Sequence, residues 1–586
     1  MLRKLRCLFL LTLTSSPCFA QSSNSQPAAS ASPPTTAAIP SSSQPAQNSS
    51  AGSSSSAPSG ASAPPLPDPL GDAMALYRKR DFEGALAKYR EILQRNPKSP
   101  DAFAGIVRVY LKQKKVDEAA HAADQGLALS DAPRIRVAHA EVLFRQGKIE
   151  EAEKEWVNII NSGHPEARAY LGLSRVRHAV AMYKSSQIAI KKAHELDPGD
   201  PDIEERWVTT LSRSERIKYL EDSLAADNNW DDERRFSTAH YLEYLKERAK
   251  KKDHPCRLVS KVTATETPLV RLLLDPRHLR GFGLTVELNG HKSSLMLDTG
   301  ASGILVRRGI AEKAGISKVT ETRIGGIGDK GRKNGYLGMA DSIKIGGLEF
   351  QNCPVEVIEG RSVGDEDGLI GADVFDDFLV DLDFPDEKLK LSELPKRPGA
   401  PQQELTLKDE EGDSDSEADD PSHEASSADA KNAPPRSSGP QDRYIAPEMH
   451  SYTPIFLFGH NVLVPTKIGD VPYKLFLLDS GAFRNSISPA AAREVTKVGI
   501  DPNMHVKGVS GSVNKVFNAN KATFTFGHLR QENQDIVAFD TTSISDSIGT
   551  EVSGFLGFTM LRLLDIKIDY RDALVDFSYD PSHWRF

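Results

Sequence analysis

An apolar run that ends in an acid, a hydroxyl residue and a glycine occurs twice in this chain of 586 residues. The first copy is Leu295–Ser302 (LMLDTGAS) and the second is Phe476–Ala482 (FLLDSGA). A short continuous apolar run is typical of a buried strand, so each copy predicts a strand that presents a carboxylate at its end. We therefore expect the chain to contain two β units that carry the same motif.

The two copies share more than the motif itself. A signal for a tight hairpin turn lies eight residues before the first acid, at Asn289-Gly290, and nine residues before the second, at Gly469-Asp470. A Gly-apolar-apolar-Gly segment ends 73 residues after the first acid and 78 residues after the second, and a further acid follows each segment by twelve residues. The two acids, the two closing glycines and the two later acids are Asp298 and Asp479, Gly371 and Gly557, and Asp383 and Asp569.

A single Asp-Thr/Ser-Gly triplet is weak evidence, because average residue usage produces one by chance in roughly one chain of this length in three or four. Two triplets with the same downstream pattern are far less expected by accident. On these residues both units resemble the retropepsin-like, or gag-polyprotein-type, aspartic protease fold, over about 280–394 and 453–580. Their tandem arrangement is similar to the two lobes of pepsin-like enzymes.

The resemblance implies roles for particular residues. Asp298 and Asp479 would face each other across the interface between the lobes as the catalytic pair. Thr299 and Ser480 would bond across that interface, and the remaining residues expected to support the pair are Gly300, Ser302, Gly481, Gly371 and Gly557. Two carboxylates about 3 Å apart share one proton, so that the ionised member can activate water while the protonated one polarises the scissile carbonyl. This chemistry predicts no cofactor and no metal.

One feature departs from the family's pattern, and another concerns the loop that would cover the substrate. A hydroxyl follows the first motif at Ser302, whereas Phe483 stands at the matching place after the second, so one bond to the second acid is expected to be missing. The Gly-rich loop Ile324–Gly338 is a candidate for the flap that covers the substrate. Tyr336 is its candidate aromatic tip, although an ordinary hairpin tyrosine is the favoured interpretation.

The N-terminal half has helical periodicity with an internal repeat. Three similar segments place alanines at Ala85, Ala119 and Ala152, with spacings of 34 and 33 residues, and prolines follow two of the predicted helices. The pattern resembles the tetratricopeptide repeat and predicts an all-α solenoid over residues 68–250. Such an array presents a groove for a protein or peptide partner, or it serves as a spacer, and the sequence favours neither.

The first residues are typical of an export signal. A basic start and a short apolar run precede a small-residue cleavage site, which predicts a signal peptide over residues 1–20 and a periplasmic or secreted protein. Residues 21–67, rich in Ser, Ala and Pro, are expected to be a disordered spacer. No later segment predicts a transmembrane helix. Cys256 and Cys353 are equally well explained as a pair and as isolated thiols, so a bridge is not predicted.

The charge of the chain is concentrated in one segment. The net charge is −8, but residues 404–442 carry twelve acids and three bases, so the rest of the chain is close to neutral. This distribution predicts an acidic disordered linker over residues 395–451, and nothing in it argues for a nucleic-acid partner. The sequence also shows no metal-ligand spacing, whether a Cys-x-x-Cys pair or a His-Glu-x-x-His motif.

The sequence therefore predicts a helical repeat solenoid followed by an all-β, two-lobed aspartic-protease-like region, with lobes at 278–394 and 452–586. The predicted function is endopeptidase cleavage of a polypeptide substrate, with the repeats recruiting a substrate or a partner. Two alternatives stay open. One is a binding protein with an inactive protease fold, and the other is a peptidase whose units pair with those of a second chain.

Overall fold

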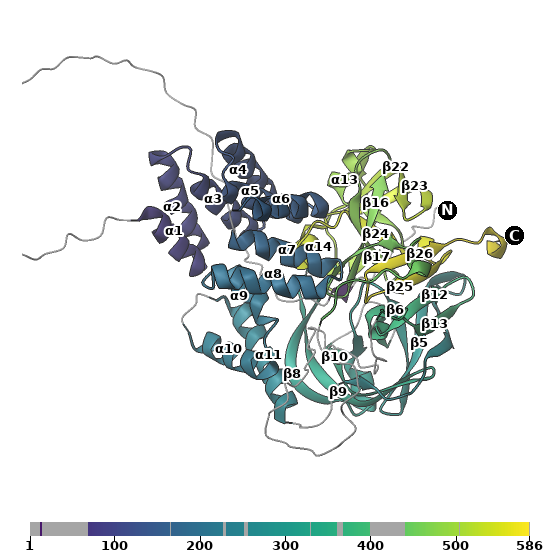
Figure 1. Ribbon diagram of the computed structural model, residues 1–586. Coiled ribbons are helices and arrows are strands. Elements are labelled where there is room, and N and C mark those ends of the chain that lie inside the picture. Colours follow the sequence, from purple (N-terminus) through teal and green to yellow (C-terminus); the bar gives the residue numbers. More distant parts are fainter. Residues whose placement is uncertain are drawn as a thin grey trace, which may run out of the picture.

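The computed structural model describes residues 68–584 with gaps at 164–165, 227–229, 251–255, 329, 360–366, 399–439 and 503, together with the short strand β1 (Thr12–Leu13). The predicted spacer lies outside the described residues, as does the predicted signal peptide except for β1, which pairs with Gly325 and Gly326. A helical array and a β-rich region make up the described chain (Figure 1).

The helical array begins with eight helices in antiparallel pairs. The small residues of the repeat lie where helices cross: Ala85, Ala119 and Ala152 are fully buried. A Cβ added at Gly105 would lie 2.3 Å from the Tyr89 ring, so only glycine fits there. The helices are α1 (Pro69–Arg78), α2 (Phe82–Arg95), α3 (Pro100–Lys112), α4 (Val116–Leu129), α5 (Pro133–Arg145), α6 (Ile149–Asn161), α7 (Ala167–Ala179) and α8 (Tyr183–Leu196).

Three further helices, α9 (Pro201–Val208), α10 (Arg213–Ala225) and α11 (Asp232–Lys250), complete the array. A buried polar network joins α9 to the first helix. Arg168 donates to Asp202 over 2.6 Å and to Asp200 over 2.6 Å, and the Tyr77 hydroxyl donates to Asp202 over 2.9 Å. Because these groups are buried and mutually paired, the space between α1 and α9 is filled by the chain itself.

The first β unit contains the first acid motif. It begins earlier than residue 278, where the sequence analysis placed it, because the edge strands β2, β3 and β4 precede that point and lack a sustained alternation of apolar and polar residues. Its elements are β2 (Arg257–Leu258), β3 (Ala264–Pro268), β4 (Val270–Asp275), β5 (His278–Leu288), β6 (His291–Asp298), β7 (Ile304–Arg307), α12 (Arg308–Lys313), β8 (Ser317–Gly326), β9 (Lys333–Ile345), β10 (Leu348–Ile358), β11 (Gly368–Gly371), β12 (Phe378–Asp383) and β13 (Lys388–Glu393).

The second β unit contains the second acid motif. Its elements are β14 (Thr453–Pro454), β15 (Phe456–Phe458), β16 (Asn461–Ile468), β17 (Lys474–Asp479), β18 (Ser486–Ile487), α13 (Pro489–Arg493), β19 (Val498–Ile500), β20 (Lys507–Gly508), β21 (Gly511–Ser512), β22 (Val516–Phe526), β23 (Leu529–Phe539), α14 (Thr542–Ile548), β24 (Gly554–Gly557), α15 (Phe558–Leu561), β25 (Asp565–Asp569) and β26 (Leu574–Ser578).

The two units have the same strand pairing. In the first, β6 runs parallel to β11, which pairs antiparallel with β7, and β7 runs parallel to β10. In the second, β17, β24, β18 and β23 repeat these three pairings in the same order and orientation. The duplicated sequence pattern is therefore a duplicated fold.

A third sheet joins the two units. Its strand order is β14-β26-β25-β12-β13-β3, and the central pairing of β12 with β25 connects one unit to the other. The linker predicted over residues 395–451 is too long at both ends. Arg397 forms an ion pair with Asp572 over 2.5 Å, and Ala446 and Met449 are buried against the second unit. These apolar and paired residues hold the flanks of the acidic segment against the β region.

The helical array packs directly on the second unit. Phe144 of α5 lies 6.0 Å, centre to centre, from the Phe458 ring, and its carbonyl accepts a hydrogen bond from the Thr550 hydroxyl over 2.6 Å. Arg145 forms an ion pair with Asp546 over 2.9 Å. One apolar cluster includes side chains of α5, α6, α7 and the second unit. The array and the β region thus share a buried interface, and their ribbons lie side by side (Figure 1).

Cys256 and Cys353 form a disulfide, which decides between the pair and the isolated thiols that the sequence left open. The bond ties the segment before β2 to β10, and β2 itself pairs with β10. The two cysteines are 97 residues apart in the sequence, so the pairing depends on the position of β2, which the sequence did not predict.

Candidate active site

The structure brings the two motif acids together within one chain. Asp298 ends β6 and Asp479 ends β17, and both side chains are fully buried. Each acid lies beside the closing glycine of its own unit, because Gly371 is the register partner of Asp298 and Gly557 is the partner of Asp479. The same parallel pairing therefore positions both carboxylates.

The hydroxyl residues after the acids form four hydrogen bonds across the interface between the units. Thr299 Oγ1 donates to the Leu478 carbonyl over 2.8 Å and accepts from the Ser480 N–H over 2.9 Å. In return, Ser480 Oγ donates to the Leu297 carbonyl over 3.0 Å and accepts from the Thr299 N–H over 3.0 Å. All four groups are buried, so this reciprocal set fixes the two acid loops relative to each other.

The motif glycines allow the acids to approach each other. A Cβ added to Gly300 would lie 2.8 Å from the Asp479 carboxyl carbon, and one added to Gly481 would lie 2.3 Å from Asp298 Oδ2. Each glycine therefore faces the carboxylate of the other unit, where any larger residue would clash. The backbone also bonds each acid: Asp298 Oδ1 accepts from the Gly300 N–H over 2.9 Å, and Asp479 Oδ1 accepts from the Ala482 N–H over 2.7 Å.

The surroundings raise the pKa of Asp479 well above its ordinary value. Burial is the largest cause and the nearby charge of Asp298 is the next, while the N–H groups of Ala482 and Gly481 oppose them. Asp479 Oδ2 is buried without a hydrogen-bond partner among the described residues, and a proton shared with Asp298 would satisfy it. Because the two acids titrate together, the proton belongs to the pair.

Ser302 has a partner that the sequence analysis missed. Its hydroxyl donates to Asp373 Oδ2 over 2.7 Å, and the Gly303 N–H donates to Asp373 Oδ1 over 3.0 Å. Asp373 lies two residues after Gly371, whose N–H donates to the Gly303 carbonyl over 2.8 Å. Gly371 leaves room for this arrangement, since an added Cβ would lie 2.1 Å from Asp373 Oδ1.

The second unit supports its acid loop with different side chains. Asn485 Oδ1 accepts from the Gly557 N–H over 2.8 Å, and its amide donates to Gln531 over 2.8 Å and to Asn533 over 2.9 Å. Thr559, two residues after Gly557, donates from its hydroxyl to the Phe483 carbonyl. The equal spacing of Asp373 and Thr559 from their glycines was the available signal for these residues.

The Gly-rich loops of the two units meet. The hairpin of β8 and β9 reaches the loop between β20 and β21: the Ser510 N–H donates to the Ile327 carbonyl over 3.0 Å, and the Lys330 N–H donates to the Ser510 carbonyl over 2.9 Å. Below the junction, an apolar cluster joins side chains of both loops to residues beside the acids. Its members are Met296, Leu305, Ile324, Ile358, Leu369 and Val509, with Leu272 packed against them.

Tyr336 is not the aromatic tip of this loop. It lies within β9, where its register partners are Val357 on β10 and Glu321 on β8, and its ring packs in the core with Lys318 5.8 Å from its centre. The sequence placed Tyr336 in the hairpin but did not predict that it lies within a strand. A Gly-rich stretch gives little information about where a turn ends and a strand begins. The interpretation as an ordinary hairpin tyrosine is correct.

Comparison with known proteins agrees with both halves of this architecture. Residues 284–374 match the family model described as aspartyl protease, and residues 76–136 match that described as tetratricopeptide repeat. The chain thus contains a retropepsin-like aspartyl protease domain and tetratricopeptide repeats.

Curated relatives match a short part of the chain. The UBA domain-containing protein Mud1 of Schizosaccharomyces pombe is 33% identical over 110 residues, which are 18% of this chain and 32% of that protein. DNA damage-inducible protein 1 of Cryptococcus neoformans is 32% identical over 111 residues, 19% of this chain and 25% of that protein. The chain therefore spans only about a quarter to a third of these relatives.

Among solved structures, a thermophilic TPR protein of Thermus thermophilus is 17% identical, with a TM-score of 0.24, over 31% of this chain and 98% of its own. MamA is 16% identical, with a TM-score of 0.18, over 31% of this chain and 95% of its own.

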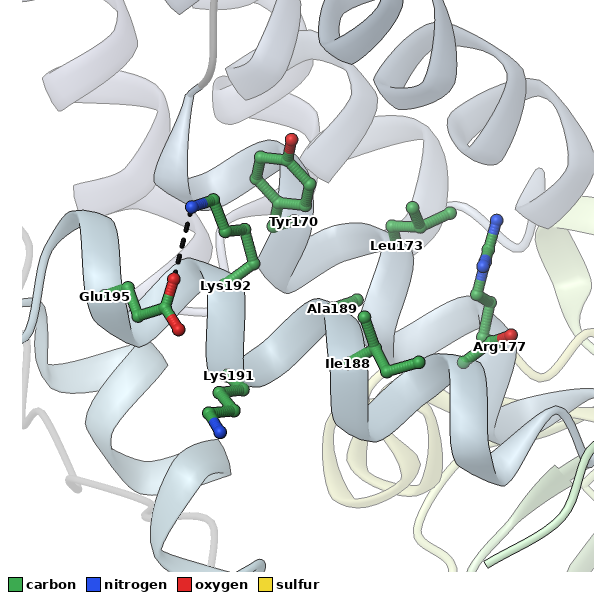
Figure 2. Close-up of a pocket in the computed structure, with 9 residues that line it drawn as sticks. Tyr170, Leu173, Arg177, Ile188, Ala189, Lys191, Lys192 and Glu195 are labelled. Carbon is green, nitrogen blue, oxygen red and sulfur yellow. Dashed lines mark hydrogen bonds and ion pairs between the residues drawn. The ribbon is translucent and has the colours of Figure 1, made fainter.

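A further pocket lies in the helical array, away from the acids. It has a volume of 440 Å³ and lies between α7 and α8, where Tyr170, Leu173 and the exposed Ile188 lie near the ion pair of Lys192 with Glu195 (Figure 2). Within the part of the chain that the structure describes, no cluster of His, Cys, Asp or Glu is arranged to hold a metal ion, and no helix is long and apolar enough to cross a bilayer.

Proposed function

We propose that this protein is an aspartic endopeptidase whose catalytic pair is Asp298 and Asp479. The observation that carries the proposal is the reciprocal contact of the two acids, in which each carboxylate lies against the glycine of the other unit. Burial and the charge of Asp298 raise the pKa of Asp479, which favours a pair holding one proton. Such a pair needs no nucleophilic side chain.

In the proposed reaction, the ionised carboxylate takes a proton from a water molecule that attacks the scissile carbonyl. The protonated carboxyl donates a hydrogen bond to the carbonyl oxygen, where negative charge develops. Thr299 and Ser480 keep the carboxylates in position through their bonds across the interface. The proposed substrate is a polypeptide, because a carboxylate pair that activates water can attack a peptide carbonyl.

A non-catalytic role is the second candidate, and one observation favours it. The second acid loop has Phe483 where the first has Ser302, so the second loop lacks the hydroxyl that binds Asp373 in the first unit. In that case the site would hold a peptide without cleaving it. Pairing between two chains has no comparable support, since the two acids of a single chain already meet.

The proposal also covers the role of the helical repeats and the compartment in which the protein acts. We infer that the helical array recruits a substrate or a partner protein on its outer surface, because the space between α1 and α9 is filled by the network around Arg168. We also infer export to the periplasm or beyond. The bond between Cys256 and Cys353 supports it, since disulfides persist in oxidising compartments.

The test is cleavage of an unfolded protein between about pH 3 and pH 7 by the wild type, Asp298→Asn and Asp479→Asn. Each substitution removes an ionisable group and should lower kcat about 10²- to 10⁴-fold. Circular dichroism of each variant checks that the fold is retained. A wild-type protein that is inert at every pH would favour the binding role, and an active Asn variant would exclude that acid from the catalytic pair.

A further inference from the structure

The last helix of the array lies against the β8–β9 hairpin, whose Ile324 shares an apolar cluster with Met296, two residues before Asp298. Helix α11 packs against β8, and β8 continues into the tip that meets Ser510 of the second unit. We propose that α11 is a latch that holds the β8–β9 hairpin closed over Asp298 and Asp479. The array would thereby control access to the site as well as recruit proteins. The latch rests on the proposed function for its purpose, but its contacts and its opening do not depend on catalysis.

Four residues on one face of α11 contact the hairpin or pack beside those that do. Glu233, Phe236, His240 and Glu243 follow one another at intervals of three or four residues, which places them on the same side of the helix. On the hairpin, Thr320 Oγ1 donates to Glu243 Oε2 over 2.6 Å and lies 2.9 Å from His240 Nδ1. Thr320 is buried beneath the helix, so these bonds are shielded from solvent on the hairpin side.

The second contact joins Glu233 to the hairpin's arginines. Glu233 forms an ion pair with Arg323 on β8 and another with Arg332, near the tip, over 3.4 Å. The Arg323 guanidinium also lies 4.5 Å from the centre of the Phe236 ring, within reach of a cation–π contact. One carboxylate of the helix thus holds two places on the hairpin, on the strand and at the tip.

Positive charge on the hairpin makes the Glu233 carboxylate important for keeping the hairpin closed. Lys330 and Lys333 of the tip lie near Lys507 of the opposite loop, and the pKa of Lys333 is lowered by burial and by these two lysines. Arg332 directly precedes Lys333 in the chain, so lysines of both loops and this arginine lie close to the closed junction. Like charges at short distance favour separation, so removal of the Glu233 carboxylate should favour the open hairpin.

A closed hairpin also has to move for a substrate to reach the acids. Both carboxylates are fully buried, and the two loop tips are joined by two backbone hydrogen bonds. A polypeptide therefore reaches the acids only when these bonds and the contacts with α11 open. The population of the open state, and with it the apparent affinity for substrate, then depends on how strongly α11 holds the hairpin.

The experiment compares the full-length wild type with Glu233→Gln, Glu233→Arg and the exchanged pair Glu233→Arg with Arg323→Glu. Hydrogen–deuterium exchange of residues 320–336 reports opening directly. Glu233→Gln should increase amide exchange in this hairpin about two- to fivefold, as expected for loss of partly exposed ion pairs. Glu233→Arg should increase it further, and the exchanged pair should lower it again part of the way, because Arg332 then faces an arginine.

The matched control is Glu221→Gln, which removes the ion pair of Glu221 with Lys246 on α11 over 2.6 Å without touching the hairpin. It should leave hairpin exchange at the wild-type level, with a similar Tm. Exchange that is unchanged in Glu233→Arg, or raised equally by the control, would overturn the latch.

Cleavage is the second readout, with KM expected to fall about two- to fivefold in Glu233→Gln at constant kcat. A raised KM would contradict the latch. If no variant cleaves any substrate, the peptidase proposal fails while the exchange measurement still decides whether the latch exists.

Discussion

The two β units share their backbone and differ in the side chains around it. Both place an acid at the end of a strand beside a closing glycine, and both send a hydroxyl across to the other unit. Around that frame, the first unit binds its acid loop with the Asp373 carboxylate, whereas the second uses the Asn485 amide. Strand pairing and the hydrogen bonds across the interface are thus common to both units, while each loop has its own polar support.

The two units also differ in what packs on them. The second unit has its core joined to α5, α6 and α7 of the array, and its covering loop is short. The first unit has a long covering hairpin whose contacts with the last helix, α11, include polar and charged groups. Apolar burial makes the contact between the array and the second unit a stable one. The polar contact between α11 and the hairpin of the first unit suits a part that moves.

The largest effect is expected where the units are alike. Thr299→Val and Ser480→Ala each remove one hydroxyl and leave a buried carbonyl and N–H of the other unit without partners. Each should lower the free energy of unfolding by about 2–4 kcal/mol. Urea denaturation measures it, with Thr299→Ser and Ser480→Thr as conservative controls. If only one of the two substitutions lowers the free energy of unfolding, the two units do not contribute alike to the interface between them.

A smaller and unequal effect is expected where the units differ. Asp373→Ala removes a charged acceptor used by Ser302 and Gly303, which should cost about 1.5–3 kcal/mol of unfolding free energy. Thr559→Val, at the equivalent place, removes one neutral hydrogen bond and should cost about 1 kcal/mol. The same denaturation experiment compares them, and equal losses would show that the two loops are supported alike.

The smallest effect concerns the sheet that joins the units. Asp381 on β12 lies next to Asp565 on β25, and burial, followed by its hydrogen bond to Asp565, raises the pKa of Asp381 to about 7. Because the folded chain keeps this proton while the unfolded chain loses it above about pH 4, stability should fall as pH rises from about 4 to 7.

Solvent exposure of Asp381 limits this contribution to about 1 kcal/mol. Asp381→Asn should therefore flatten the dependence of unfolding free energy on pH in that range. Denaturation at pH 4, 5.5 and 7 measures the slope, with Asp576→Asn as a control on the same sheet. An unchanged slope would mean that the junction between the units does not hold this proton.

The sequence predicted the parts of the site that are local and repeated. Asp298, Asp479 and their glycines belong to two copies of a short motif, so comparison within one chain was sufficient. Asn485 was missed because its partners lie on other loops and no periodicity records such contacts, while Asp373 had only its spacing from Gly371, equal to that of Thr559 from Gly557, as a signal. The bond between Cys256 and Cys353 and the docking of α5 on the second unit likewise depend on packing between distant segments.

The central claim is that one chain supplies both acids of a single catalytic pair. The direct test mixes Asp298→Asn with Asp479→Asn and measures cleavage of an unfolded protein, beside each variant alone and the wild type, with the mass of each species from light scattering. We expect the mixture to stay as inactive as its components and the wild type to be active as a monomer. Activity recovered on mixing, in a species of twice the mass, would show that the acids pair between chains and would contradict the account.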